Sequence, residues 1–133
     1  MARILVVDDD RAVLEITSEL LAACGHRVLA TGSPERALRA LEGGEVVDLL
    51  VTDVRMPVLT GPQLAAHARE LLPGLSVLFM SGADTVAPGE AFIAKPFTLE
   101  RLLDAVHGLL RGRGLDAPVG HTLGIRHLTP ALL

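Results

Sequence analysis

The segment around Asp53 constrains the fold more than any other part of this 133-residue chain. The apolar run Val46–Val51, interrupted only by Asp48, predicts a strand buried on both faces, as the strands of parallel sheets are. Asp53 follows this strand directly, although a buried carboxylate is costly unless it is paired or bound to a metal. At the carboxyl end of a parallel strand, however, it faces the crevice where open α/β sheets bind ligands. The sequence therefore predicts a functional carboxylate at the edge of a parallel sheet.

Short apolar runs alternate with segments of helical periodicity. Besides the strand before Asp53, strands are expected at 4–7, 26–30, 75–80 and 91–94. Helix starts are marked by side chains that accept backbone N–H bonds of the first turn, namely Asp10, Ser33, Thr60 and Thr98. Strands that alternate with helices predict an α/β fold with a doubly wound, five-stranded parallel sheet.

The segment between the last two strands is short. A parallel crossover with a helix usually needs about ten to twelve residues or more, and Pro88 and Gly89 occupy part of this one. We expect one helical turn at most, at 83–87, so that the fourth helix is shortened or absent.

Composition excludes several classes of function. The net charge of −4 provides no basic face, which argues against direct nucleic-acid binding. No apolar run reaches membrane-spanning length and no signal peptide precedes the first strand, so a cytoplasmic protein is expected. The single cysteine, Cys24, fits a reducing compartment and is expected to be a small buried residue.

Polar side chains follow four of the predicted strands, and in a parallel sheet these strand ends share one rim. They are Asp8 and Asp9, Asp53, Ser81 and Lys95. Three neighbouring carboxylates repel one another, and a divalent cation removes that cost; oxygen ligands supplemented by waters suit Mg²⁺. The cation and Lys95 would neutralise a phosphoryl group on Asp53, to which Ser81 would donate a hydrogen bond.

At these residues the sequence resembles the receiver domain of two-component response regulators. The resemblance runs from Arg3 to about Leu110 and rests on four motifs in matching order, which are Ile-Leu-Val-Val-Asp-Asp-Asp at 4–10, Asp-Val-Arg-Met-Pro at 53–57 with Gly61 following, Met-Ser-Gly at 80–82 and Lys-Pro-Phe at 95–97. It implies a flavodoxin-like sheet of strand order 2-1-3-4-5. The short last crossover resembles that of receivers attached to hybrid histidine kinases.

The resemblance implies a phosphorelay role. Asp53 would accept a phosphoryl group from a histidine kinase or a histidine phosphotransfer protein, and the phosphorylated form would signal by protein–protein interaction to a target that the sequence does not name. Ser81 would be the switch hydroxyl and Phe92 the switch aromatic that turns inward. The chain would be a phosphoacceptor rather than an enzyme, and a monomer or weak homodimer.

The resemblance also implies how the metal is held. Asp9 and Asp53 would bind Mg²⁺ directly, Asp8 through water, and Arg55 through its backbone carbonyl. The Lys95–Pro96 peptide bond would be cis.

The phosphodonor is expected to dock beside Asp53, over the first helix and the loop after the fifth strand. Ala12, Glu15, Pro96 and Phe97 are the expected contact residues, with Phe97 as an exposed apolar anchor. The histidines on helices, His67 and His107, are expected at the surface and outside this chemistry.

Two other classes of function use a similar sheet. A haloacid-dehalogenase-like phosphatase needs a second acid two residues after its nucleophile, where this chain has Arg55, which does not give up its proton. A flavodoxin-like FMN-binding module needs a hydroxyl- or glycine-rich phosphate loop after the first strand, where this chain has three acids. Both remain alternatives at this stage.

The chain divides into a receiver domain at 1–112 and a tail at 113–133 that is too short for an output domain. If the fourth helix is missing, the sheet face beside Val77, Phe79 and Ile93 would lose its cover. The apolar residues of the tail would then pack there or on a second subunit; they are Leu115, Val119, Leu123, Ile125, Leu128, Leu132 and Leu133. A linker from a larger protein is the alternative.

Overall fold

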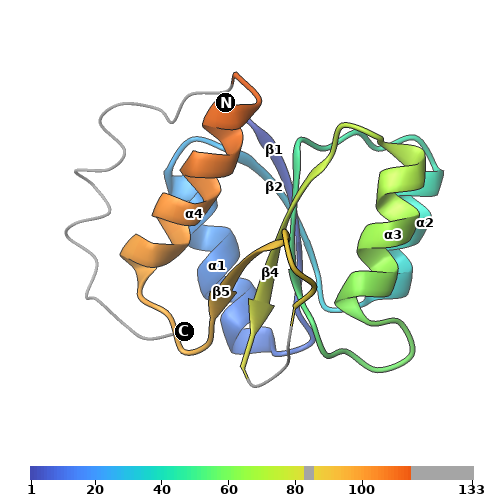
Figure 1. The fold of residues 1–133 in the computed structure, drawn as a ribbon, viewed down its shortest axis with the longest axis horizontal. Coiled ribbons are helices and arrows are strands. Elements are labelled where there is room, and N and C mark those ends of the chain that lie inside the picture. Colours follow the sequence, from blue (N-terminus) through green and yellow to red (C-terminus); the bar gives the residue numbers. More distant parts are fainter. Residues whose placement is uncertain (83–85, 115–133) are drawn as a thin grey trace.

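A computed structural model describes residues 1–82 and 86–114 of the chain. Its sheet is all-parallel, in the order β2-β1-β3-β4-β5. The strands are β1 (Arg3–Val7), β2 (Arg27–Thr31), β3 (Leu49–Asp53), β4 (Ser76–Ser81) and β5 (Ala91–Ala94). The helices are α1 (Arg11–Ala23), α2 (Pro34–Glu42), α3 (Gly61–Leu71) and α4 (Leu99–Gly112). Helices α1 and α4 lie on one face of the sheet and α2 and α3 on the other (Figure 1), which confirms the predicted doubly wound α/β fold.

Each face of the sheet has its own core, because successive residues of a strand point to opposite sides. On β1, Ile4 and Val6 pack toward α1 and α4, whereas Leu5 and Val7 pack toward α2 and α3. Full burial of such side chains stabilises the fold by about 1.5–3 kcal/mol each. Cys24 is buried in the first core, as expected, and burial raises the pKa of its thiol to about 11.

All four predicted helix caps are confirmed. The Asp10 side chain accepts the N–H of Ala12 at 3.0 Å. The side chains of Ser33 and Thr98 each accept the N–H three residues ahead. Thr60 and Gln63 form a reciprocal capping box, in which each side chain accepts the other residue's backbone N–H. These caps fix where each helix leaves the rim of the sheet.

The strand before Asp53 begins later than the apolar run predicts. Val46 is 52% exposed and β3 starts at Leu49. Asp48 causes the difference: its side chain accepts the Arg3 N–H and its own N–H donates to the Arg3 carbonyl, both at 2.8 Å. Asp53 is itself the last residue of β3, in register with Met80 of β4.

The described part of the last crossover, Gly82 and 86–90, contains no helix. Glu90 instead forms a bidentate ion pair with Arg69 of α3, with two N–O distances of 2.8 Å. Val86 packs against the core beneath α2 and α3. In the described part of the crossover, the ion pair of Glu90 and the packing of Val86 attach the chain to the α3 side of the sheet. Most of the helical turn expected at 83–87 lies outside the described residues.

The prediction that Val77, Phe79 and Ile93 share one uncovered face is wrong. Phe79 is in register with Phe92, so Ile93 points to the opposite face, with Met80. All three side chains are buried, whereas Phe92 of β5 is 56% exposed. Residues 115–133, to which the tail hypothesis applies, lie outside the described residues. No helix of the described ranges is long and apolar enough to cross a bilayer.

Candidate functional site

The Lys95 side chain contacts two of the predicted site carboxylates, Asp8 and Asp53. Its Nζ lies 2.9 Å from Oδ2 of Asp8 and 3.5 Å from Oδ1 of Asp53. Lys95 follows β5 and Asp8 follows β1, so the side chain passes over the ends of β3 and β4. The structure thus brings together strand ends that are 87 residues apart in sequence.

Three carboxylates stand at this rim. Asp8 is fully buried, the Asp53 side chain is 14% exposed, and Asp9 is exposed. One oxygen from each lies within 4.8 Å of the others, the only such group of metal-ligating side chains found in the described ranges. The two Asp8 oxygens already accept hydrogen bonds, one from Lys95 and one from the Asp10 N–H at 2.8 Å. Asp8 is therefore the most enclosed of the three carboxylates, and Asp9 is the most open to solvent.

The electrostatics of the rim favour additional positive charge. Burial raises the pKa of Asp8, against the lowering effects of the Asp10 N–H and Lys95. Burial also raises the pKa of Asp53, and the negative charge of Asp8 adds to the rise. Burial acts to lower the pKa of Lys95, but its contacts with both carboxylates outweigh this and leave the pKa raised. One ammonium group therefore faces more negative charge than it can neutralise.

The main chain of Asp53 is positioned by the loop that follows it. The Val54 carbonyl accepts the Gly61 N–H at 2.9 Å, and the Thr52 hydroxyl donates to the Asp53 carbonyl at 3.0 Å. A Cβ atom on Gly61 would overlap the Asp53 carbonyl oxygen, so this close approach requires glycine. Sequence reasoning used Gly61 only as part of a motif and missed this positioning role.

The last two strands complete the rim. Ser81 ends β4 and is 3% exposed, and its carbonyl accepts the Lys95 N–H at 2.7 Å. The Lys95–Pro96 peptide bond is cis. The expectation that Phe97 is an exposed anchor is wrong, because its side chain is 1% exposed in the core beneath α1 and α4. Phe92 is the exposed phenylalanine of this region.

The two helical histidines differ in environment. His67 is exposed, as expected. His107 is half-buried instead, and its Nε2 lies 3.4 Å from Nε2 of His26, whose Nδ1 accepts the Ala2 N–H. The surface expectation is therefore wrong for His107, because α4 packs this side chain against the start of β2.

A parallel sheet of this order, with carboxylates and a lysine on one rim, defines a receiver-type phosphoacceptor domain. The chain belongs to the response regulator receiver domain family, whose sequence profile matches residues 4–107. Membership of this family favours the receiver function over the phosphatase and FMN-binding alternatives.

Relatives and solved structures agree with this assignment. The chain is 37% identical over 130 residues to the response regulator FleR of Pseudomonas aeruginosa, covering 89% of this chain and 27% of FleR. It is 35% identical to the response regulator MprA of Mycobacterium ulcerans, covering 86% and 52%. The receiver domain of the hybrid histidine kinase CckA superposes with a TM-score of 0.72 at 38% identity, covering 81% and 98%. The chain thus spans between a quarter and about half of these curated relatives.

Proposed function

We propose that Asp53 is the phosphoacceptor of this receiver domain, in a two-component phosphorelay. The observation that carries the proposal is the contact of Lys95 Nζ with both Asp8 and Asp53 at the carboxyl edge of the sheet. Asp53 is the member of this cluster that combines partial exposure with a position at the end of a central strand. A phosphodonor can reach it, while the core beneath holds it in place.

The reaction is a direct transfer between two nucleophiles. An Asp53 carboxylate oxygen attacks phosphorus of a phosphohistidine on a histidine kinase or phosphotransfer protein. The new bond joins phosphorus to the Asp53 oxygen, the phosphorus–nitrogen bond breaks, and the imidazole leaves with the electron pair. Lys95 places positive charge beside the incoming phosphoryl oxygens, and Ser81 is the candidate hydroxyl donor to one of them. The chain acts as an acceptor, with at most self-phosphotransfer and autodephosphorylation as its own catalysis.

The carboxylates fit a magnesium ion. The exposed Asp9 and the partly exposed Asp53 are the proposed direct ligands, whereas Asp8 is buried and both of its oxygens accept hydrogen bonds, which suits a water-mediated role. Arg55, two residues after Asp53, is the proposed donor of a backbone carbonyl. When bound, Mg²⁺ supplies positive charge that offsets the charge of the phosphoryl group.

The proposed docking surface for the phosphodonor comprises the start of α1 and the loop after β5. Ala12 and Glu15 of α1 are exposed, as is Pro96, which directly follows Lys95. Phe97 is left out of this surface because it is buried.

Phe92 and Ser81 form the proposed switch. Phe92 is exposed on β5, beside Phe79 in the register of the sheet, and the crossover that precedes it contains no helix in its described part. An inward turn of Phe92 on phosphorylation would change the exposed surface of β5. We propose that a protein target, in the cytoplasm, responds to that change.

The test is intact mass after treatment with acetyl phosphate and Mg²⁺. The wild-type chain should gain one phosphoryl group and Asp53→Asn should gain none. Asp104→Asn, an exposed carboxylate on α4, is the matched control and should behave as the wild type. A full gain in Asp53→Asn would refute the assignment.

A further inference from the structure

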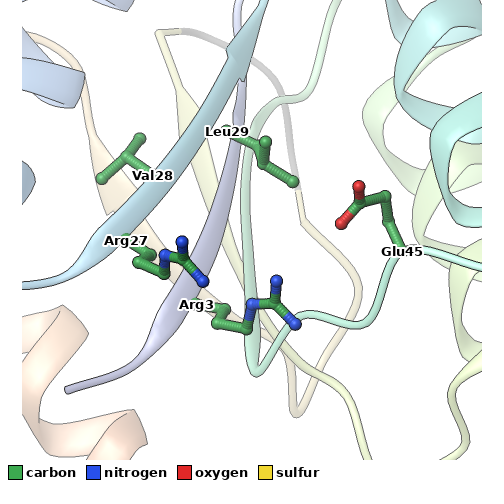
Figure 2. A pocket seen from close by; sticks show the side chains of 5 residues that line it. All are labelled: Arg3, Arg27, Val28, Leu29 and Glu45. Carbon is green, nitrogen blue, oxygen red and sulfur yellow. The ribbon is translucent and has the colours of Figure 1, made fainter.

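A second charged feature lies at the amino end of the sheet, on the free edge strand β2. Arg3 of β1 and Arg27 of β2 are paired in the register of the sheet, and both are exposed. With Val28, Leu29 and Glu45 they line a hollow of about 320 Å³ (Figure 2). Like charges on neighbouring strands repel each other, so an anion between the two arginines would be favoured.

The two guanidinium groups form no ion pair within the described ranges, although Glu45 lines the same hollow. Neither side chain has an ion pair within 4.0 Å or a hydrogen bond there. Figure 2 shows Arg3 between Arg27 and Glu45, so the acid lines the hollow on the side away from Arg27. An anionic group placed in the hollow would relieve the repulsion and form charge-assisted hydrogen bonds with guanidinium donors.

The hollow continues along β2. A second one, of about 250 Å³, shares Leu29 and Glu45 with the first and lies between β2 and α2. Its lining adds small apolar side chains and a further cation, Arg36, which also has no ion pair among the described residues. Leu29, 41% exposed, lies where the two hollows meet. Together they form a groove with an apolar floor and a cationic wall, which we name the β2 groove.

The outer edge of β2 also offers unpaired backbone groups. The Arg27 N–H donates to the Ala2 carbonyl and the Thr31 carbonyl accepts the Asp8 N–H, so the odd-numbered residues of β2 face β1. Because backbone groups alternate along a strand, those of Val28 and Ala30 point outward, and no described strand pairs with that edge. An extended chain can therefore add to β2 by main-chain hydrogen bonds.

We propose that the β2 groove binds an extended acidic segment of a partner protein, which adds a strand to β2 and places carboxylates against Arg3 and Arg27. The cationic wall selects the sign of the charge, Leu29 receives an apolar side chain, and Val28 and Ala30 supply the main-chain pairing. A second copy of this chain is a poor occupant because it would present the same arginines. The arginine pair stands at the amino end of β1 and β2, whereas Asp53 stands at the carboxyl end of β3, so the charge contacts of the groove are separate from the phosphoacceptor.

The probe is a fluorescent peptide of alternating acidic and apolar residues, Glu-Val-Glu-Val-Glu-Val-Glu, with binding followed by anisotropy. The wild-type chain should bind it saturably and should not bind the same peptide with lysine in place of glutamate. Arg27→Glu should weaken binding roughly tenfold, equivalent to about 1.4 kcal/mol. Arg101→Glu, an exposed arginine on α4, is the matched control and should leave the affinity unchanged.

A second variant tests the strand pairing without changing charge. Ala30→Pro removes an outward N–H that the sheet does not use, and proline is tolerated on edge strands; it should also weaken binding. Circular dichroism checks that each variant is folded. If Ala30→Pro does not fold, the binding of the peptide to Arg27→Glu alone tests the proposal. Unchanged binding in Arg27→Glu, or equal weakening in Arg27→Glu and Arg101→Glu, would overturn the proposal. So would a wild-type chain that does not bind the peptide but forms a dimer which dissociates in Ala30→Pro.

Discussion

Gly61 contacts the main chain of Asp53 so closely that a Cβ atom at position 61 would overlap the Asp53 carbonyl oxygen. The first residue of α3 thereby fixes the backbone of the proposed phosphoacceptor. Gly61→Ala is expected to displace Asp53 and to lower both the rate of phosphorylation by acetyl phosphate and the free energy of unfolding, the latter by about 1–3 kcal/mol.

Gly108 provides the control for this substitution. It lies within α4, and an added Cβ would have only the end of the Arg111 side chain nearby, at 3.9 Å. Gly108→Ala should therefore leave phosphorylation unchanged and stabilise the domain by about 0.5–1 kcal/mol, measured by urea unfolding. Equal behaviour of the two variants would show that Gly61 has no positioning role.

Metal binding should discriminate between adjacent acids. Asp9 is exposed and belongs to the three-carboxylate group, whereas Asp10 is engaged as the cap of α1. In calorimetric titrations with Mg²⁺, Asp9→Asn should bind much more weakly than the wild type, because it loses a ligand and a negative charge. Asp10→Asn keeps a capping side chain and removes the same charge, so its affinity should stay close to that of the wild type. Similar losses in both variants would indicate a diffuse charge effect and no defined site.

The Arg69–Glu90 pair should make the domain less stable in acid. The hydrogen bond from Arg69 lowers the pKa of Glu90 below 4.5. The contribution of the ion pair to the free energy of unfolding is therefore complete above pH 4.5 and disappears as the pH falls through the lowered pKa. Glu90→Gln should cost about 0.2–1 kcal/mol at pH 7, since both side chains are partly exposed. Glu70→Gln, an exposed position on α3, should cost less. Thermal unfolding of the wild type and both variants between pH 3 and pH 7 measures these differences in stability. A loss of stability in Glu90→Gln that persists at the lowest pH would contradict the predicted titration of the ion pair.

The His26–His107 contact should respond to pH nearer neutrality. Burial lowers the pKa of His107 below 6.5; Arg111 adds to the effect and Asp104 opposes it. Folding therefore favours the neutral form of His107. The contribution of the buried neutral imidazole to stability is complete above pH 6.5 and is lost as the pH falls through the lowered pKa. His107→Gln should flatten the dependence of melting temperature on pH between 5 and 7. The same slope in His67→Gln and His107→Gln would show that the contact does not titrate.

Local sequence signals were sufficient for the framework. The side chains that start helices, such as Thr60 with Gln63, act on neighbouring backbone groups, so their roles can be read from a few residues. The rim could also be predicted, since strand ends in a parallel sheet converge whatever their distance in sequence. The sequence does not indicate that Lys95 lies closer to Asp8 than to Asp53, because these distances depend on how the Lys95 side chain crosses the ends of two intervening strands.

The errors concern which way side chains face. A large apolar side chain on the loop after the fifth strand predicts an interface anchor at Phe97, but the chain turns this side chain into the core before α4. The sequence pattern alone does not separate Ile93 from the face of Phe79, whereas the β4–β5 register places Phe92 on that face. His107 meets His26 across 81 residues of sequence, a tertiary contact that helical periodicity does not encode.

The central claim is that the phosphoryl group is carried by Asp53, and the most direct measurement identifies the acyl phosphate itself. The chain is phosphorylated with acetyl phosphate and Mg²⁺, reduced with borohydride, which converts a phosphorylated aspartate to homoserine, and analysed by peptide mass spectrometry. Homoserine at position 53 alone is the predicted result. Homoserine at Asp8 or Asp9, or phosphorylated protein without conversion at Asp53, would contradict the account.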